Sequence, residues 1–161
     1  MKKLALICVS SFMVLASCTK EKRLCCVLPP SEPFIMADKG SDKWHAEPEI
    51  LKIGNDSIAI TGKESEARLS LHIKFTGKGT YALKDKQATY SLTVGQDVSV
   101  AEYALDNTAV NKVEVIDYDP KKGVIWGTFA VTLKKIYANP TEAYPDQIKF
   151  LNGQFSEALP K

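Results

Sequence analysis

The chain has 161 residues and a mass of 17.7 kDa, and its 45% hydrophobic and 25% charged residues are typical of one globular domain. That composition excludes a chain disordered throughout, and 9 glycines with 8 prolines exclude collagen-like sequence. Basic residues number 21 against 19 acidic, so the net charge of +2 lacks the basic excess of a nucleic-acid-binding protein.

A targeting segment is predicted at the start of the chain. Met1, Lys2 and Lys3 form a short positively charged stretch before the apolar run Leu4–Val14. This run has 11 residues, whereas a membrane-spanning helix needs about 20. The pattern is therefore typical of a signal peptide.

The four residues that follow, Leu15-Ala16-Ser17-Cys18, resemble the lipobox of bacterial lipoproteins. In that class of protein the cysteine thiol takes a diacylglycerol group, and the peptide bond before it is then cut. The resemblance implies a signal peptide over residues 1–17, lipidation of Cys18 detectable by palmitate labelling, and a membrane anchor made by the acyl chains. The alternative is an ordinary secretory signal that is cut elsewhere. Removal of residues 1–17 leaves 144 residues with 19 basic and 19 acidic side chains.

Residues 18–43 are expected to hold the acylated cysteine and a flexible tether. The segment is charged at its start, contains three prolines and ends in turn-forming residues, which favours irregular, extended backbone. The apolar stretches 24–28 and Phe34-Ile35 interrupt this pattern, and one of them could dock onto the domain. Neighbouring Cys25 and Cys26 have no zinc-ligand spacing with the two histidines, so they are interpreted as ordinary tether residues whose oxidation state stays open.

From Trp44 onward the hydrophobic pattern has a period of two, which predicts β-strands. In Arg68–Phe75 every second residue is apolar, and a second such face runs from Ile125 to Leu133 through Phe129 and Val131. Shorter strands are predicted at Glu49–Ile53, Ser57–Thr61, Gly79–Leu83, Ala88–Val94, Val98–Ala104, Asn111–Tyr118 and Gln147–Leu151, all rich in strand-forming residues.

Turn signals separate these strands. In Asp119-Pro120-Lys121-Lys122-Gly123, the aspartate can bond its own backbone, the proline presets φ and the glycine supplies a positive φ, which predicts a hairpin loop. Short strands with turns about every 8–12 residues predict an all-β, antiparallel β-sandwich or barrel-like domain over residues 44–157. The longest irregular stretch, 134–146, holds two prolines and has room for one helical turn.

The C-terminal pattern resembles a known family. The segments Tyr118–Phe129 and Ile148–Phe155, with Trp44-His45-Ala46 and Gly79–Leu83, are similar to uncharacterised lipoproteins of Bacteroidetes-type bacteria, a DUF6252-like domain of unknown function. The resemblance covers roughly residues 44–156. It implies an antiparallel β fold and an outer-membrane lipoprotein of the cell envelope, on either its periplasmic or its surface side, and it brings no catalytic residue.

Polar residues give no clear catalytic constellation. Asp117 and Asp119 share one strand face about 7 Å apart. They could pair as carboxylates or bind Ca²⁺, but no loop rich in aspartate or asparagine supplies the further oxygen ligands that calcium needs. They are better explained as an exposed face that leads into a turn cap. His45 and His72 have no identifiable partner, and no nucleophile elbow, P-loop or dinucleotide motif is present. We therefore expect no metal site and no cofactor.

Aromatic residues are the better candidates for a binding site. Trp44, Trp126, Tyr118, Tyr137 and Tyr144 could form an exposed platform that stacks on sugar rings or binds a protein. Trp126 is opposite in phase to Ile125 and Gly127, which places it on the outer face. Alternatively it packs under the 134–146 loop or the tether.

These observations favour a lipid-anchored, non-catalytic β module of the envelope that binds a glycan or a protein partner and no nucleic acid. Two alternatives stay open. One is an enzyme whose site is assembled from scattered residues such as Asp117, Asp119 and His72, and the other is a purely structural envelope protein.

Overall fold

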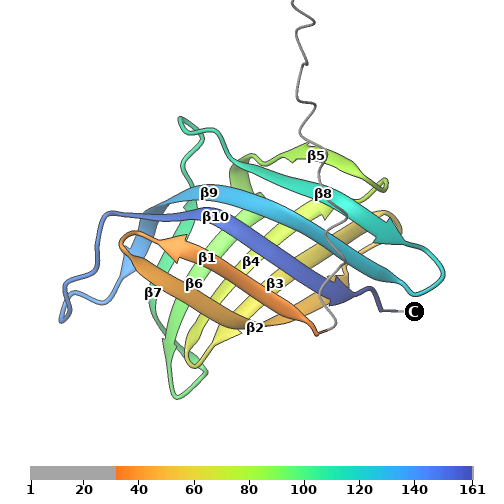
Figure 1. Cartoon of the computed structure of the whole chain (residues 1–161). Coiled ribbons are helices and arrows are strands. Elements are labelled where there is room, and N and C mark those ends of the chain that lie inside the picture. Colours follow the sequence, from red (N-terminus) through yellow and green to blue (C-terminus); the bar gives the residue numbers. More distant parts are fainter. Residues whose placement is uncertain (1–31, 161) are drawn as a thin grey trace, which may run out of the picture.

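A computed structural model describes residues 32–160 of the chain (Figure 1). This part contains ten β-strands and one short 3-10 helix, in the order β1 (Phe34–Lys39), β2 (Asp42–Lys52), β3 (Ser57–Glu64), β4 (Ala67–Lys74), β5 (Gly79–Ala82), η1 (Asp85–Gln87), β6 (Ala88–Val94), β7 (Val98–Leu105), β8 (Lys112–Asp119), β9 (Val124–Ala138) and β10 (Gln147–Ala158). The predicted signal peptide, Cys18, Cys25 and Cys26 lie outside the described residues.

All strands belong to one antiparallel sheet that closes in a ring. Eight strands form the ring in chain order, and β10 closes it by pairing with both β9 and β1. Figure 1 shows β1 and β10 side by side, although they come from opposite ends of the described chain. Because a closed sheet has no free edges within the ring, its strands are protected from pairing with other chains. The predicted all-β, antiparallel class is confirmed, in its barrel-like form.

Strands β5 and β8 branch from this ring at β9. The first half of β9 pairs with β8 and its second half with β7, both on the same side of the strand, while β10 pairs along the other side. Strand β5 pairs only with β8. Strand β9 can serve three partners because it has 15 residues.

Alternate residues of each strand point into the ring and are buried there. In β4 the inward residues Leu69, Leu71 and Ile73 are at most 2% exposed, whereas Arg68 before them and Lys74 after them face solvent. The same alternation buries Phe129, Val131 and Leu133 in β9. Both faces that the sequence pattern predicted are confirmed.

Aromatic side chains fill the middle of the ring. Trp44 packs edge-on against Phe150 with ring centroids 5.1 Å apart, and Phe150 packs against Tyr90 at 5.2 Å. Tyr90 in turn lies 6.0 Å from Tyr103. An eight-stranded closed sheet is just wide enough for its own side chains or one small ligand. Here side chains occupy that space, which leaves the outer face and the two ends of the ring for a binding site.

The folded domain begins earlier than the sequence predicted. The expected tether reached residue 43, but residues 34–39 form β1 between β2 and β10, and Ile35 and Ala37 are buried. This short strand was overlooked because the preceding prolines and the following Gly40-Ser41 turn read as linker. The pair Phe34-Ile35, which the sequence marked as able to dock, is its start.

Two further boundaries differ from expectation. Residues 134–138 of the predicted irregular stretch continue β9, and the rest is a loop with a hydrogen-bonded turn from Asn139 to Glu142. Strand β10 runs on past Leu151 to Ala158, and Asn152-Gly153 form a bulge within it. Nowhere in residues 32–160 is there a helix long and apolar enough to cross a membrane.

Candidate functional site

A groove crosses the outer face of the sheet over β10. Its larger part, about 350 Å³, lies between β1, β2 and β10, and its continuation, about 320 Å³, lies over β9 towards β8. Asn152 and Gln154 of β10 line both parts and make them one surface, which we call the outer-face groove. Its remaining lining residues are Met36, Ala37, Asp38, Lys43, His45, Lys112, Thr128, Phe129, Ala130 and Gly153.

Asp38 is the fixed centre of the groove. One carboxylate oxygen pairs with the Lys43 ammonium, and the other accepts a 2.8 Å hydrogen bond from the Asn152 side-chain amide. The bond from Asn152, followed by the bond from Lys43, lowers the pKa of Asp38 below its ordinary value. Asp38 is therefore ionised at neutral pH and offers further lone pairs as acceptors. His45 and Gln154 beside it are exposed.

The bulge in β10 explains why Asn152 can reach Asp38. The strand register shifts between Phe150 and Gly153 and, on the β1 side, between Met36 and Asp38. Asn152 takes φ = 51°, a left-handed conformation that asparagine tolerates better than most residues. Gly153 follows because a Cβ there would lie 2.6 Å from the Phe129 ring. The Asn-Gly pair therefore aims the Asn152 amide into the groove.

Trp126 lies on the outer face, beyond the end of the groove lining on β9. It lies opposite Ser156 of β10 on one side and Asp117 of β8 on the other, and Ser156 lies opposite Phe34 of β1. Phe34 and Trp126 are half-buried, and Ser156 between them is only 2% exposed. Trp126 is two residues from Thr128 on the same face, about 7 Å along the strand. Two aromatic side chains thus lie on either side of Ser156, and the predicted outward phase of Trp126 is confirmed.

The other predicted aromatic residues do not join Trp126. Trp44 is 2% exposed inside the ring, and Tyr118 packs on the inner side against Phe75 with ring centroids 5.2 Å apart. Tyr137 is 49% exposed near the far end of β9. Tyr144 lies in the loop before β10, where its hydroxyl donates to Glu142 and this bond raises its pKa to about 12. A single platform of all five is therefore not formed.

Most of the polar residues singled out in the sequence have local partners. Asp117 pairs with Lys78 on the surface, and its pKa is lowered chiefly by the hydrogen bond from that lysine. Asp119 accepts bonds from the backbone amides of Lys121 and Lys122, as predicted for the hairpin loop. His72 lies on the outer face opposite Ala59. Only His45 lines the outer-face groove.

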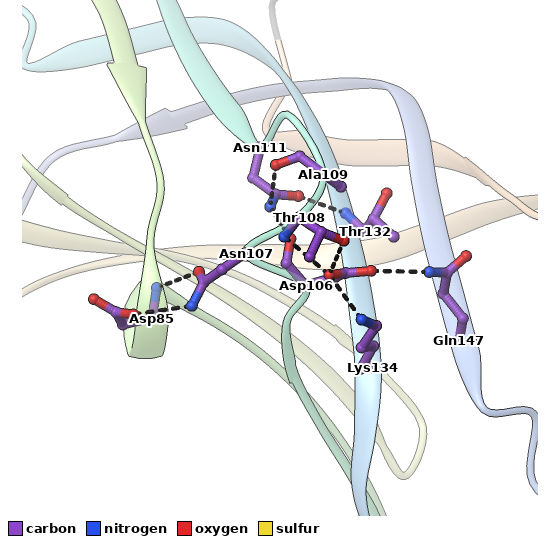
Figure 2. A network of polar contacts seen from close by, with 9 residues as sticks. All are labelled: Asp85, Asp106, Asn107, Thr108, Ala109, Asn111, Thr132, Lys134 and Gln147. Atoms are coloured by element: carbon purple, nitrogen blue, oxygen red, sulfur yellow. Dashed lines mark hydrogen bonds and ion pairs between the residues drawn. The ribbon is translucent and has the colours of Figure 1, made fainter.

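A polar network that the sequence analysis missed surrounds Asp106, after β7 (Figure 2). The Asp106 residue is 4% exposed. Its carboxylate accepts bonds from the Thr108 hydroxyl at 2.6 Å and the Thr108 amide at 3.0 Å, pairs with Lys134 at 3.0 Å, and accepts a bond from Gln147 at 3.1 Å. Its backbone carbonyl accepts a bond from the buried Asn111, whose own side-chain oxygen accepts the Thr132 amide at 2.8 Å.

This network is built to hold a loop. The bonds from Thr108, ahead of the Lys134 ammonium, lower the pKa of Asp106 to about 2. A general base works best with a pKa near the operating pH. The low pKa of Asp106 and the four donors that its carboxylate already accepts therefore suit a structural role better than that of a general base. The network fixes the β7–β8 connection onto β9 and β10. No sequence motif marks it, because its members are spread from Asp106 to Gln147.

Metal ligands are not gathered in the described part of the chain. Within residues 32–160 no three histidine, cysteine, aspartate or glutamate side chains come close enough together to hold a metal ion. The outer-face groove contributes only Asp38 and His45 of these types.

The fold and the groove define an all-β protein with a closed antiparallel sheet and a groove on its outer face. A family model described as a domain of unknown function, DUF6252, matches residues 31–158, so the chain belongs to that family. The match begins just before β1, in agreement with the domain start in the structure. No curated protein and no solved structure gave a match.

Proposed function

We propose that this chain is a lipid-anchored cell-envelope protein whose folded domain is a non-catalytic module that binds a glycan in the outer-face groove. The lipid anchor is supported by the order of charged residues, apolar run and lipobox at the N-terminus, with Cys18 as the acylated residue. Binding of a glycan is supported by one observation above the others: Asp38, Asn152 and Gln154 line one groove on the outer face, and the outward-facing Trp126 lies two residues beyond the groove residue Thr128.

The chemistry of the groove suits a sugar. A pyranose carries a ring of hydroxyl groups, each able to donate and accept, together with an apolar C–H face. Carboxylate and amide side chains supply acceptors and donors for the hydroxyls, and an aromatic ring packs against the C–H face. The Asp38–Asn152 bond holds two of these groups in place before a ligand arrives, which reduces the entropy lost on binding.

The charge of the groove favours a neutral ligand over a nucleic acid. Lys43 is paired with Asp38, and Lys112 lies 3.8 Å from Glu114. Binding to a phosphate backbone depends on lysine and arginine side chains that neutralise phosphates, and the two groove lysines already have acidic neighbours. The lining combines charged and amide groups with apolar surface, which suits the hydroxyl groups and the C–H face of a glycan.

A direct test uses the full chain in detergent and a panel of soluble hexasaccharides of glucose, xylose, mannose and N-acetylglucosamine, with calorimetry as the readout. At least one hexasaccharide should bind. Trp126→Ala should weaken that binding by at least about tenfold, and Asn152→Gly, which keeps the left-handed backbone but removes the amide, should weaken it as well.

The matched control is Tyr137→Ala, which removes an exposed aromatic residue from β9 far from the groove. This variant should bind as the wild type does. If no hexasaccharide binds, or if Trp126→Ala and Tyr137→Ala bind equally well, the glycan function is wrong.

A further inference from the structure

A second cleft lies at one end of the ring, separate from the outer-face groove. It is formed where the β1–β2 turn at Gly40-Ser41 faces the start of β10 and the loop before it. Its volume is about 360 Å³, within the roughly 300–1,000 Å³ typical of small-molecule sites. It shares no lining residue with the outer-face groove, and we call it the end cleft.

Lys39, the last residue of β1, lines this cleft. The Nζ atom donates to the hydroxyl of Tyr90 at 2.8 Å and lies 5.0 Å from the centroid of the ring. Tyr90 is fully buried, and its hydroxyl fixes the position of the ammonium. A lysine has three N–H donors, and this bond uses one of them. No carboxylate among residues 32–160 lies within ion-pairing distance of Lys39.

Two acidic residues, Asp42 and Asp146, lie next to the cleft but do not line it. Asp42 lies opposite Lys39 across the hairpin, and its carboxylate accepts a bond from the Ser41 hydroxyl at 3.3 Å. Asp146 pairs with Lys135 at 2.8 Å. A second lysine, Lys149, lines the cleft and is exposed. The lining is therefore cationic, with two ammonium groups and no aspartate or glutamate.

The wall of the cleft is apolar and held in place. Pro145 and Ile148 line it, and Ile148 is 7% exposed. The buried Tyr103 donates its hydroxyl proton to the Pro145 carbonyl at 3.0 Å, and Lys135 donates to the Tyr144 carbonyl at 2.8 Å. Because these bonds fix the loop before β10, the cleft is formed in advance and a ligand loses less entropy in ordering it.

From this arrangement we propose that the end cleft binds a small carboxylate that carries an apolar body. The carboxylate accepts charge-assisted hydrogen bonds from the remaining N–H donors of Lys39. The apolar body packs against Pro145 and Ile148. The Lys39 ammonium, which has no carboxylate partner among the described residues, recognises the charge of the ligand. Pro145 and Ile148 form the site for its apolar part.

Benzoate is the probe for this site, and its neutral isostere benzamide is the chemical control. Calorimetric titration of the full chain in detergent should show saturable benzoate binding and at least about tenfold weaker benzamide binding. Lys39→Gln, which can still donate an amide bond to Tyr90, should weaken benzoate binding at least about tenfold. Lys39→Arg keeps the charge and should bind within about threefold of the wild type.

Lys52→Gln is the matched protein control, because it removes the same charge from an exposed position at the other end of β2. It should bind benzoate as the wild type does. Circular dichroism of each variant establishes that the sheet is intact. Absence of saturable benzoate binding, equal binding of benzoate and benzamide, or equal binding by Lys39→Gln and wild type would each overturn the proposal. None of these results bears on glycan binding in the outer-face groove.

Discussion

The side-chain amide of Asn152 donates a 2.8 Å hydrogen bond to the carboxylate of Asp38, joining two residues 114 positions apart in the chain. The bond spans the contact at which β10 meets β1 and the ring closes. It therefore ties the groove that we propose as the glycan site to the closure of the fold. A change that removes β1 removes both.

The first prediction concerns the start of the folded domain. A chain that begins at residue 32 should fold, whereas one that begins at Trp44 should not. The shorter chain loses β1, so β2 and β10 lose their pairing partner. It also loses Ile35, which is 1% exposed, and full burial of such a side chain contributes about 1.5–3 kcal/mol. Far-UV circular dichroism and thermal melts of the two chains make the comparison. A cooperative melt of the chain from Trp44 would show that β1 is dispensable.

The second prediction separates the inner from the outer face. Phe129→Ala should lower the free energy of unfolding by about 3–5 kcal/mol, because the Phe129 ring is 2% exposed and packs over Gly153. His72→Ala on the outer face of β4 should change it by no more than about 0.5 kcal/mol. Urea titrations of both variants provide the test. Equal midpoints for Phe129→Ala and wild type would contradict the assignment of the inner face.

The strands were predictable because their signal is local. Alternation in Arg68–Phe75 and in the segment from Ile125 to Leu133 is set by which face meets the core, and a period of two can be read from neighbouring residues. The turn at Asp119 was predictable for the same reason, since the aspartate bonds amides two and three positions along the chain.

The parts that were not predictable depend on distant residues. β1 consists of only 6 residues and is stabilised by partners that include the other end of the chain. The groove depends on Asn152 meeting Asp38, and the loop network on Asp106 meeting Gln147. Among the five aromatic residues suggested for binding, Trp126 could be assigned to the outer face because it alternates with Ile125 and Gly127. The burial of Trp44 could not be predicted, because it follows from packing against Phe150.

A third prediction tests the lipid anchor. Growth with a palmitate analogue should label the wild-type chain. Cys18→Ser should remove the label, because the thiol of this cysteine is the group that takes the diacylglycerol. Cys25→Ser and Cys26→Ser serve as controls and should keep the label. Equal labelling of Cys18→Ser and wild type would refute the lipoprotein assignment.

The final prediction uses the pKa of Asp106. The carboxyl has a pKa of about 2 in the folded chain, below its ordinary 3.8, because Thr108 and Lys134 stabilise the ionised form. A group whose pKa is lowered by folding stabilises the fold above its unfolded pKa and loses this contribution as the pH falls through its folded pKa. Asp106→Asn should therefore lower the melting temperature at about pH 6, since it places an amide N–H₂ among groups that already donate. The difference from wild type should shrink towards about pH 2, where the wild-type carboxyl also becomes protonated. Thermal melts of the two proteins across this pH range test the prediction. Asp117→Asn is a surface control that should have little effect. A difference in melting temperature that stays constant with pH would mean that Asp106 acts through packing alone.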